Sequence, residues 1–245
     1  MLHERIPNLA KLVEPDRVHR LCYTDQDIFD LEIKNIFEKT WQYCGHESQI
    51  PNPGDFWTFQ IGRQPMLMVR AEDGKIHVLY NRCTHRGVQV CGSRKGHADG
   101  ALTCPYHAWR FHFDGRLESV PLERGYKDTK FDKNDPAYAL TPAASTDIYR
   151  GFVFAKLDAS GPTLAEWMGP AKIAIDDMCD RSPEGRVIAV QPSNRVIQRS
   201  NWKFFMENQI DAVHPSVTHM AAGQAAAEIE RKISESVRLG ASGRS

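Results

Sequence analysis

Two short motifs, each pairing a cysteine with a histidine, constrain this sequence more than any other feature. Cys83 and His85 lie in C-T-H-R-G, Cys104 and His107 lie in C-P-Y-H-A-W, and eighteen residues separate the two pairs. Thiolate sulfur and imidazole nitrogen are ligands for zinc and for iron–sulfur clusters. Each pair follows an apolar run, so we expect both pairs at strand ends, where two loops can direct four ligands at one metal centre.

Two kinds of metal centre use two cysteines and two histidines. A mononuclear zinc site is one, but its paired ligands usually lie about two to four residues apart, and the single residue between Cys83 and His85 is awkward for that geometry. In a Rieske [2Fe-2S] cluster the cysteines hold one iron and the histidines the other, so neighbouring ligands serve different atoms. Ligand type and spacing favour the Rieske cluster, with zinc as the alternative. Cys91 lies between the motifs but matches no ligand position, and Tyr106 and Trp109 are expected to pack.

The composition is typical of a folded protein, and the balanced charge gives no sign that the protein binds a polyanion such as a nucleic acid. The chain has 245 residues, 31 basic and 31 acidic side chains, and 41% hydrophobic residues. It lacks the excess of Lys and Arg typical of nucleic-acid binding, and no stretch approaches the roughly 20 apolar residues of a membrane helix. The six cysteines are too sparse for a disulfide scaffold, and charged residues near the N-terminus argue against a secretory signal. We expect a cytoplasmic protein without a nucleic-acid or membrane partner.

Hydrophobic periodicity predicts an α+β protein in which an antiparallel β domain is inserted between two helical parts. The expected domains are residues 1–40, 41–157 and 158–245. An amphipathic helix is expected over 24–38, capped by Thr24 and Asp27. The expected strands of the β domain are 56–61, 66–71, 76–80, 109–113, 117–120 and 148–154, with tight turns at Asp73-Gly74 and Asp114-Gly115.

The remainder of the chain is predicted to be mainly helical. Thr163 and Glu166 have capping-box spacing, and Gly169-Pro170 should interrupt the helix that they begin. Two short strands are expected at 187–190 and 196–198, followed by helix over 203–239 with a break near Pro215.

A second group of candidate ligands lies in this last helical segment. Asp211, His214 and His219 form D-x2-H-x4-H. Asp211 and His214 are expected on one helix face, whereas the two histidines lie about 140° apart on an ideal helix, so a bend at Pro215 would help them converge. Two imidazoles and a carboxylate form the facial triad of non-haem iron oxygenases. Taken alone, the pattern is weak and a polar helix end is the favoured interpretation, but the upstream cluster reverses that preference in favour of iron.

These motifs together resemble the large (α) subunits of Rieske non-haem iron aromatic-ring-hydroxylating dioxygenases. C-T-H-R-G with C-P-Y-H-A-W resembles their Rieske motif, and W-Q-Y-C-G-H-E-S-Q-I-P-N-P-G-D-F at 41–56 resembles the segment that precedes it. The resemblance implies that the two motif cysteines bind one iron and the two motif histidines the other. It identifies residues 41–157 as the Rieske domain and the flanking parts as an incomplete helix-plus-sheet catalytic domain.

The resemblance also assigns roles in the second group. His214 and His219 correspond to ligands of a mononuclear Fe(II), and Asp211 to the carboxylate that bridges to a Rieske histidine of a neighbouring subunit. Glu207 and Asn208 match the N-W-K-x3-E-N stretch that precedes the motif, and two interpretations stay open for them: a position near the iron, or a surface or capping role. The family's third iron ligand is a carboxylate far downstream, so it is expected beyond Ser245, and the chain is expected to be truncated relative to the family.

The function implied is that of the oxygenase component of a multicomponent dioxygenase. Electrons would pass from the Rieske cluster to the mononuclear iron, with O2 and an aromatic small molecule as substrates and a cis-dihydrodiol as product. No G-x-G-x-x-G follows a predicted strand, so a ferredoxin or an NAD(P)H-dependent reductase is the expected electron donor. The expected assembly is a homotrimer or an α–β hetero-oligomer with a small subunit. A Rieske monooxygenase or O-demethylase, and a cluster-binding electron-transfer fragment without catalysis, are the alternatives.

Overall fold

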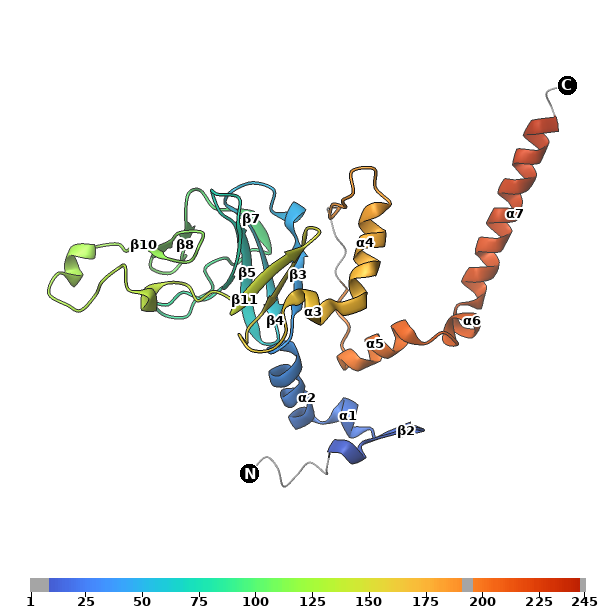
Figure 1. The fold of residues 1–245 in the computed structure, drawn as a ribbon, viewed down its shortest axis with the longest axis horizontal. Coiled ribbons are helices and arrows are strands. Elements are labelled where there is room, and N and C mark those ends of the chain that lie inside the picture. The colour runs from blue at the N-terminus through green and yellow to red at the C-terminus, as the bar shows by residue number, and fades with distance from the viewer. Residues whose placement is uncertain (1–8, 191–195, 243–245) are drawn as a thin grey trace. The chain divides into compact units, whose positions relative to one another are not determined.

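The structure is a computed structural model that describes residues 9–190 and 196–242, with side chains as far as residue 235. Backbone contacts divide the chain into two units, which are described separately. Within the described residues, unit 1 comprises 9–12 and 25–190, and unit 2 comprises 13–24 and 196–242 (Figure 1). Unit 1 holds both Cys/His motifs, and unit 2 holds the D-x2-H-x4-H motif.

Unit 1 is built mainly from antiparallel strands. They are β3 (Gln42–His46), β4 (Asp55–Ile61), β5 (Gln64–Arg70), β6 (Ile76–Tyr80), β7 (Lys95–His97), β8 (Leu102–Thr103), β9 (Arg110–Phe111), β10 (Leu117–Ser119), β11 (Ser145–Tyr149) and β12 (Phe152–Lys156). The helices are η1 (Leu9–Lys11), α2 (Gln26–Glu32), η2 (Ile33–Phe37), η3 (Glu47–Gln49), η4 (Glu123–Tyr126), η5 (Pro136–Tyr138), α3 (Leu164–Met168), η6 (Gly169–Ala171) and α4 (Lys172–Asp180). The strands form three sheets, in the orders β6-β5-β4-β7, β10-β9-β8 and β11-β12-β3, and confirm the expected class of helices with antiparallel sheets (Figure 1).

Strand β5 runs between two hydrophobic cores. Leu67 and Val69 pack into one core, and Met66 and Met68 point to the other face and pack into the second. All four are fully buried. A strand that is buried on both faces has a continuous apolar sequence instead of an alternating one, as this segment has. The first core also contains the two motif cysteines, so the packing of β5 helps to fix the metal-binding loops.

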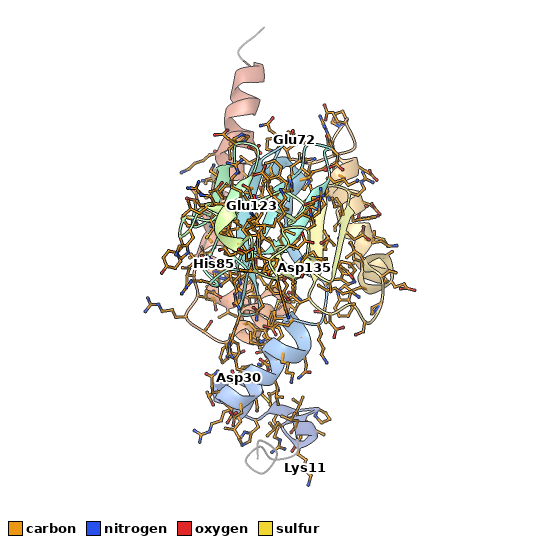
Figure 2. All side chains as sticks on the ribbon, turned by 90° about the vertical axis from the view of Figure 1, so that its left-hand side faces the viewer. Lys11, Asp30, Glu72, His85, Glu123 and Asp135 are labelled. Atoms are coloured by element: carbon orange, nitrogen blue, oxygen red, sulfur yellow. The ribbon has the colours of Figure 1, made fainter. Side chains whose placement is uncertain are left out.

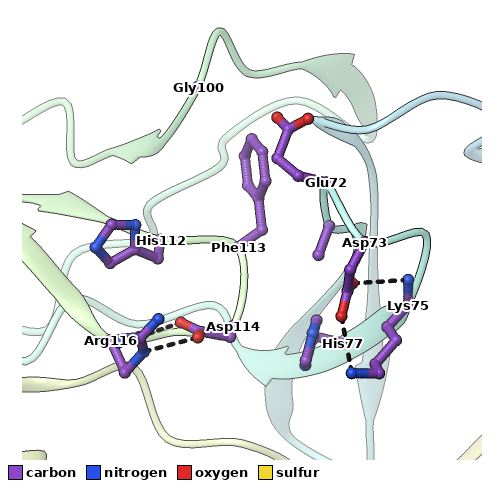
Figure 3. A pocket seen from close by; sticks show the side chains of 10 residues that line it. Glu72, Asp73, Lys75, His77, Gly100, His112, Phe113, Asp114 and Arg116 are labelled. Atoms are coloured by element: carbon purple, nitrogen blue, oxygen red, sulfur yellow. Dashed lines mark hydrogen bonds and ion pairs between the residues drawn. The ribbon is translucent and has the colours of Figure 1, made fainter.

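Both predicted hairpin turns are confirmed. Gly74 joins β5 to β6 with φ +82°, and Gly115 joins β9 to β10 with φ +94°, a conformation that favours glycine. The two turns line one cavity of about 340 Å³, and Figure 3 shows the side chains that line it. The carboxylates at the turns are paired, Asp73 with Lys75 at 2.8 Å and Asp114 with Arg116 at 2.7 Å.

The segment 148–154 is a hairpin, and the single strand predicted there is wrong. Strands β11 and β12 are joined at Arg150 and Gly151, with φ values of +50° and +87°. A non-glycine residue with positive φ is uncommon, so the sequence offers only Gly151 as a turn signal inside an apolar run. The Arg150 guanidinium compensates by binding Asp176 and Asp180 of α4.

The predicted helix at 24–38 forms, but with a different cap. Asp25 accepts a hydrogen bond from the Ile28 amide at 3.0 Å, in place of the expected Thr24 and Asp27. Helix α2 then continues into the π-helical turn η2. The capping box of Thr163 and Glu166 is confirmed at the start of α3, and Gly169-Pro170 ends that helix as predicted.

No strand forms at 187–190 or 196–198, so these two predictions are wrong for the chain as the structure describes it. The apolar side chains of these segments are exposed: Ile188 68%, Val190 75%, Val196 83% and Ile197 74%. A β-branched sequence becomes a strand only where another strand offers its edge, and these residues pair with none of the described strands.

Unit 2 combines a short hairpin with the C-terminal helices. Its elements are β1 (Val13–Glu14), β2 (Arg17–Val18), α1 (Leu21–Thr24), α5 (Trp202–Ile210), α6 (His214–Thr218) and α7 (Met220–Ser242). The predicted break near Pro215 is confirmed, because the chain leaves the helical conformation after Ile210 and Pro215 lies in the first turn of α6. In the two described stretches, no helix combines the length and the apolarity needed to cross a membrane.

Two glycines with nearly the same φ provide a matched test of the packing in unit 1. A Cβ at Gly54 (φ +83°) would lie 2.4 Å from the Ala98 carbonyl oxygen, whereas a Cβ at Gly74 (φ +82°) would meet nothing within 4 Å. We expect Gly74→Ala to reduce the free energy of unfolding by about 1–2 kcal/mol through the positive φ alone. Gly54→Ala should cost roughly 2–5 kcal/mol, because overpacking adds about 1–3 kcal/mol. Urea unfolding of both variants measures the difference, and equal losses would contradict the described contact.

Candidate metal centres

The two Cys/His loops share one backbone hydrogen-bond pattern. In the first, the Cys83 amide donates to the Val88 carbonyl and the Gly87 amide donates to the Cys83 carbonyl, both at 2.8 Å. In the second, the Cys104 amide donates to Trp109 at 2.8 Å and the Ala108 amide donates back to Cys104 at 3.0 Å. The residue four positions after each cysteine has positive φ, +75° at Gly87 and +52° at Ala108. The chain therefore builds two similar tight turns, each of which carries one cysteine and one histidine.

The turns bring the two cysteines together and the two histidines together. The Cys83 and Cys104 side chains are both 3% exposed, and the rings of His85 and His107 lie 4.7 Å apart between centroids. Burial raises the pKa of the Cys83 thiol to about 11; backbone hydrogen bonds from His85 oppose the rise, and the neighbouring Cys104 thiol reinforces it. Burial is the largest cause that lowers the pKa of His85, and the electrostatic effect of the nearby His107 lowers it further. Two adjacent imidazoles and amide groups directed at a sulfur suit metal ligation.

Aromatic packing holds His85 in place. The Trp109 indole stacks on the His85 ring at 4.8 Å with an interplanar angle of 3°, and it is itself buried. Phe131 and Tyr138 pack edge-on against the indole, so the segment after η4 covers the first turn. Figure 2 shows His85 on the side of unit 1 that also carries Glu123 and Asp135. The packing expected for Trp109 is confirmed, whereas Tyr106 contacts His107 and remains 58% exposed.

Asn81 is a buried polar residue in this region that the sequence motifs do not identify. It is 2% exposed, and its amide group binds the backbone of Cys91 twice, accepting from the amide at 2.9 Å and donating to the carbonyl at 2.8 Å. Cys91 is buried, and burial raises the pKa of its thiol to about 12. Asn81, two residues before Cys83, thus ties the loop between the motifs to the segment that leads into the first motif.

We expect Asn81→Ala to reduce the free energy of unfolding by roughly 2–6 kcal/mol, because two buried backbone groups lose their partners at about 1–3 kcal/mol each. The matched control is Asn52→Ala, which removes an exposed hydrogen bond to Asp55 and should cost about 0.5 kcal/mol or less. Urea unfolding under anaerobic conditions compares the two. Similar losses would show that the Asn81 contacts do not support the loop.

The D-x2-H-x4-H motif forms a second cluster, in unit 2. The sequence predicted that Asp211 and His214 share a helix face, and this prediction is wrong. Asp211 follows α5 in an extended conformation, with φ −75° and ψ 109°. Its Oδ1 accepts hydrogen bonds from the Val213 amide at 2.8 Å and the His214 amide at 3.3 Å, so Asp211 caps α6. These backbone hydrogen bonds lower the pKa of Asp211. The break that precedes α6 makes the cap possible, since a continuous helix would direct Asp211 away from these amides.

The two histidines of this motif are neighbours. The His214 and His219 rings lie 5.4 Å apart between centroids. The His214 Nδ1 atom is buried without a well-formed hydrogen bond, and the nearest acidic atom is Asp211 Oδ2 at 3.3 Å. An unsatisfied buried nitrogen beside a second imidazole fits a metal ligand pair. Within the described ranges, no group of three or more His, Cys, Asp or Glu side chains is arranged to hold a metal ion. The two histidines therefore have no third ligand among those residues, and the first cluster consists of a cysteine pair and a histidine pair.

Comparison with known proteins identifies the chain. Residues 40–130 match the family model of the Rieske [2Fe-2S] domain, which includes all four motif residues of the first cluster. The chain is 41% identical over 204 residues to the anthranilate 1,2-dioxygenase large subunit of Acinetobacter baylyi, covering 83% of this chain and 42% of that one. It is 38% identical over 240 residues to the toluate 1,2-dioxygenase subunit alpha of Pseudomonas putida, covering 95% and 52%. The chain belongs to the family of Rieske aromatic-ring-hydroxylating dioxygenase large subunits.

Solved structures agree with this assignment. Naphthalene 1,2-dioxygenase from Rhodococcus sp. bound to indole superposes with a TM-score of 0.76 at 32% identity, covering 83% of this chain and 46% of that one. A quaternary ammonium Rieske monooxygenase in complex with L-carnitine superposes with a TM-score of 0.74 at 25% identity, covering 84% and 56%. The chain spans about half the length of the curated Rieske dioxygenase relatives that it matches.

Proposed function

We propose that this chain is part of the oxygenase component of a multicomponent aromatic-ring-hydroxylating dioxygenase. The observation that carries the proposal is the pair of matching turns, which present two buried thiols and two adjacent imidazoles. Cys83 and Cys104 would hold one iron of a [2Fe-2S] cluster, and His85 and His107 would hold the other. Two neutral imidazoles in place of two thiolates remove negative charge beside one iron, and this raises the reduction potential.

For the second cluster, we propose that His214 and His219 bind a mononuclear Fe(II). Asp211 holds α6 in place through its Oδ1 atom and keeps Oδ2 beside the His214 ring, where it can accept a hydrogen bond from that imidazole or from a group of a neighbouring subunit. The third ligand of such a site would be a carboxylate outside the described residues. When bound, the cluster supplies single electrons and the mononuclear iron activates dioxygen.

The proposed reaction joins both atoms of O2 to adjacent ring carbons. One aromatic C–C double bond and O2, together with two electrons and two protons, give a cis-dihydrodiol; the O–O bond breaks and two C–O bonds form. A ferredoxin or an NAD(P)H-dependent reductase would supply the electrons in the cytoplasm, and the assembly would be a homotrimer or an α–β hetero-oligomer. Since two of the similar relatives are subunits of an anthranilate and a toluate dioxygenase, an aromatic carboxylate is the favoured substrate class.

Two other functions use parts of the same machinery. The superposition with a quaternary ammonium monooxygenase supports transfer of a single oxygen atom, with the other leaving as water. The separation of the two clusters into different units is compatible with a chain that only carries electrons.

One experiment separates these functions. The purified oxygenase component that contains this chain is reduced anaerobically with dithionite and exposed to ¹⁸O₂ in the presence of toluate, and the products are analysed by mass spectrometry. The proposal predicts a diol that contains two ¹⁸O atoms. A product with one ¹⁸O atom would indicate a monooxygenase, and reoxidation of the cluster without product would indicate an electron-transfer fragment.

A further inference from the structure

Tyr23, near the start of the chain, makes three contacts with the helix that leads into the second cluster. Its ring stacks on Phe204 with centroids 4.5 Å apart and an interplanar angle of 19°. Its hydroxyl donates a hydrogen bond to Glu207 Oε1 at 2.8 Å. Its backbone carbonyl accepts one from the Asn201 side-chain amide at 3.1 Å. All four residues belong to unit 2.

The contacts follow the whole length of α5. Asn201, Phe204 and Glu207 lie three residues apart from one another and are therefore neighbours on the helix surface. Asn201 is also the N-cap of α5, because its Oδ1 accepts a hydrogen bond from the Lys203 amide at 3.1 Å. Tyr23 thus touches the N-cap, the middle and the last turn of one helix.

The last turn of α5 connects directly to the candidate ligands. The Glu207 carbonyl accepts the hydrogen bond from the Asp211 amide at 3.0 Å, where the helix ends. Asp211 in turn caps α6, at whose first position His214 lies. A shift of the Glu207 turn would therefore move Asp211 and, through it, the His214 ring. The Tyr23 hydroxyl restrains that turn by its hydrogen bond to the Glu207 carboxylate.

We propose that Tyr23 is a positioning residue for the metal site formed by His214 and His219, acting through Glu207 and the end of α5. This inference rests on the proposed function, because it requires that the two histidines bind a metal. The segment of residues 13–24 contains none of the candidate ligands. According to this proposal, it helps to fix the geometry of the site. Groups that hydrogen-bond a metal ligand directly change metal affinity about 10- to 100-fold. Tyr23 acts through Glu207 and Asp211, so we expect an effect no larger than the lower end of that range.

The test uses Co²⁺ as a spectroscopic probe of the second site. Tyr23→Phe keeps the stacked ring and removes only the hydroxyl, so we expect a roughly 10-fold weaker Co²⁺ affinity and a changed visible ligand-field spectrum. Glu207→Gln retains an oxygen acceptor for the Tyr23 hydroxyl and should bind Co²⁺ nearly as the unmodified chain does, whereas Glu207→Ala should resemble Tyr23→Phe. The Rieske absorption of the same samples serves as an internal reference.

The matched control is Tyr149→Phe. The Tyr149 hydroxyl also binds a carboxylate, that of Asp176 at 2.8 Å, but it lies in unit 1. If Tyr23→Phe changes Co²⁺ affinity and spectrum no more than Tyr149→Phe does, while the unmodified chain binds Co²⁺, Tyr23 has only a structural role and the inference is overturned. If the unmodified chain binds Co²⁺ no better than His214→Ala, the proposed metal site itself fails, and the inference fails with it.

Discussion

Replacing His85 with Cys is expected to lower the reduction potential of the cluster by roughly 100–350 mV. This is about half of the interval between Rieske centres and all-cysteine [2Fe-2S] clusters, since one of two imidazoles is exchanged for a thiolate. The added negative charge disfavours the reduced state. A redox titration followed by visible absorption measures the potential, and His85 is a suitable position because its ring is fixed by stacking on Trp109.

Cys91→Ala provides the control for this prediction. Cys91 is buried in the same core as Cys83 and Cys104 but lies at no ligand position of the two turns. The variant should keep the cluster and shift the potential little. An unchanged potential in His85→Cys, or loss of the cluster in Cys91→Ala with retention in Cys104→Ser, would show that the ligand assignment is wrong.

His214→Ala is expected to remove the mononuclear iron and leave the Rieske cluster intact. The iron content of the reconstituted chain should fall from three to two atoms per chain, because the remaining His219 is a single ligand and cannot hold the ion. The visible spectrum of the cluster should not change, since its four candidate ligands belong to unit 1. Metal analysis together with absorption measures both quantities on one sample.

His112→Ala serves as the comparison for this loss. His112 lines the cavity between the two hairpin turns and belongs to neither cluster (Figure 3). This variant should retain the iron content of the unmodified chain. An unmodified chain that holds only two irons, or a His214→Ala chain that holds three, is incompatible with an iron site at His214 and His219.

The sequence signal for the first cluster and for the hairpin turns is local. Four ligand types at fixed spacing, and two Asp-Gly turns between apolar runs, each depend on a few adjacent residues. The capping box of α3 is local in the same sense. Asn81 escapes detection because its role arises from burial and from a backbone contact ten residues away.

Other features depend on contacts that no short pattern encodes. The pairing of Tyr23 with Glu207 spans 184 residues. Arg150 adopts a left-handed turn that its residue type does not suggest, and two charged residues of α4 support it. Asp211 does not continue the helix that periodicity predicts, because its carboxylate accepts hydrogen bonds from the backbone amides at the start of α6. The segments 187–190 and 196–198 have strand propensity but no pairing edge among the described strands.

The most direct test of the account is pulsed electron paramagnetic resonance of the anaerobically reconstituted and reduced chain. If Cys83, Cys104, His85 and His107 hold a Rieske cluster, the spectrum will show hyperfine coupling from two histidine nitrogens, and His85→Cys will lose one of them. A colourless chain that binds one zinc ion, or a reduced cluster without nitrogen coupling, would contradict the assignment of the two turns.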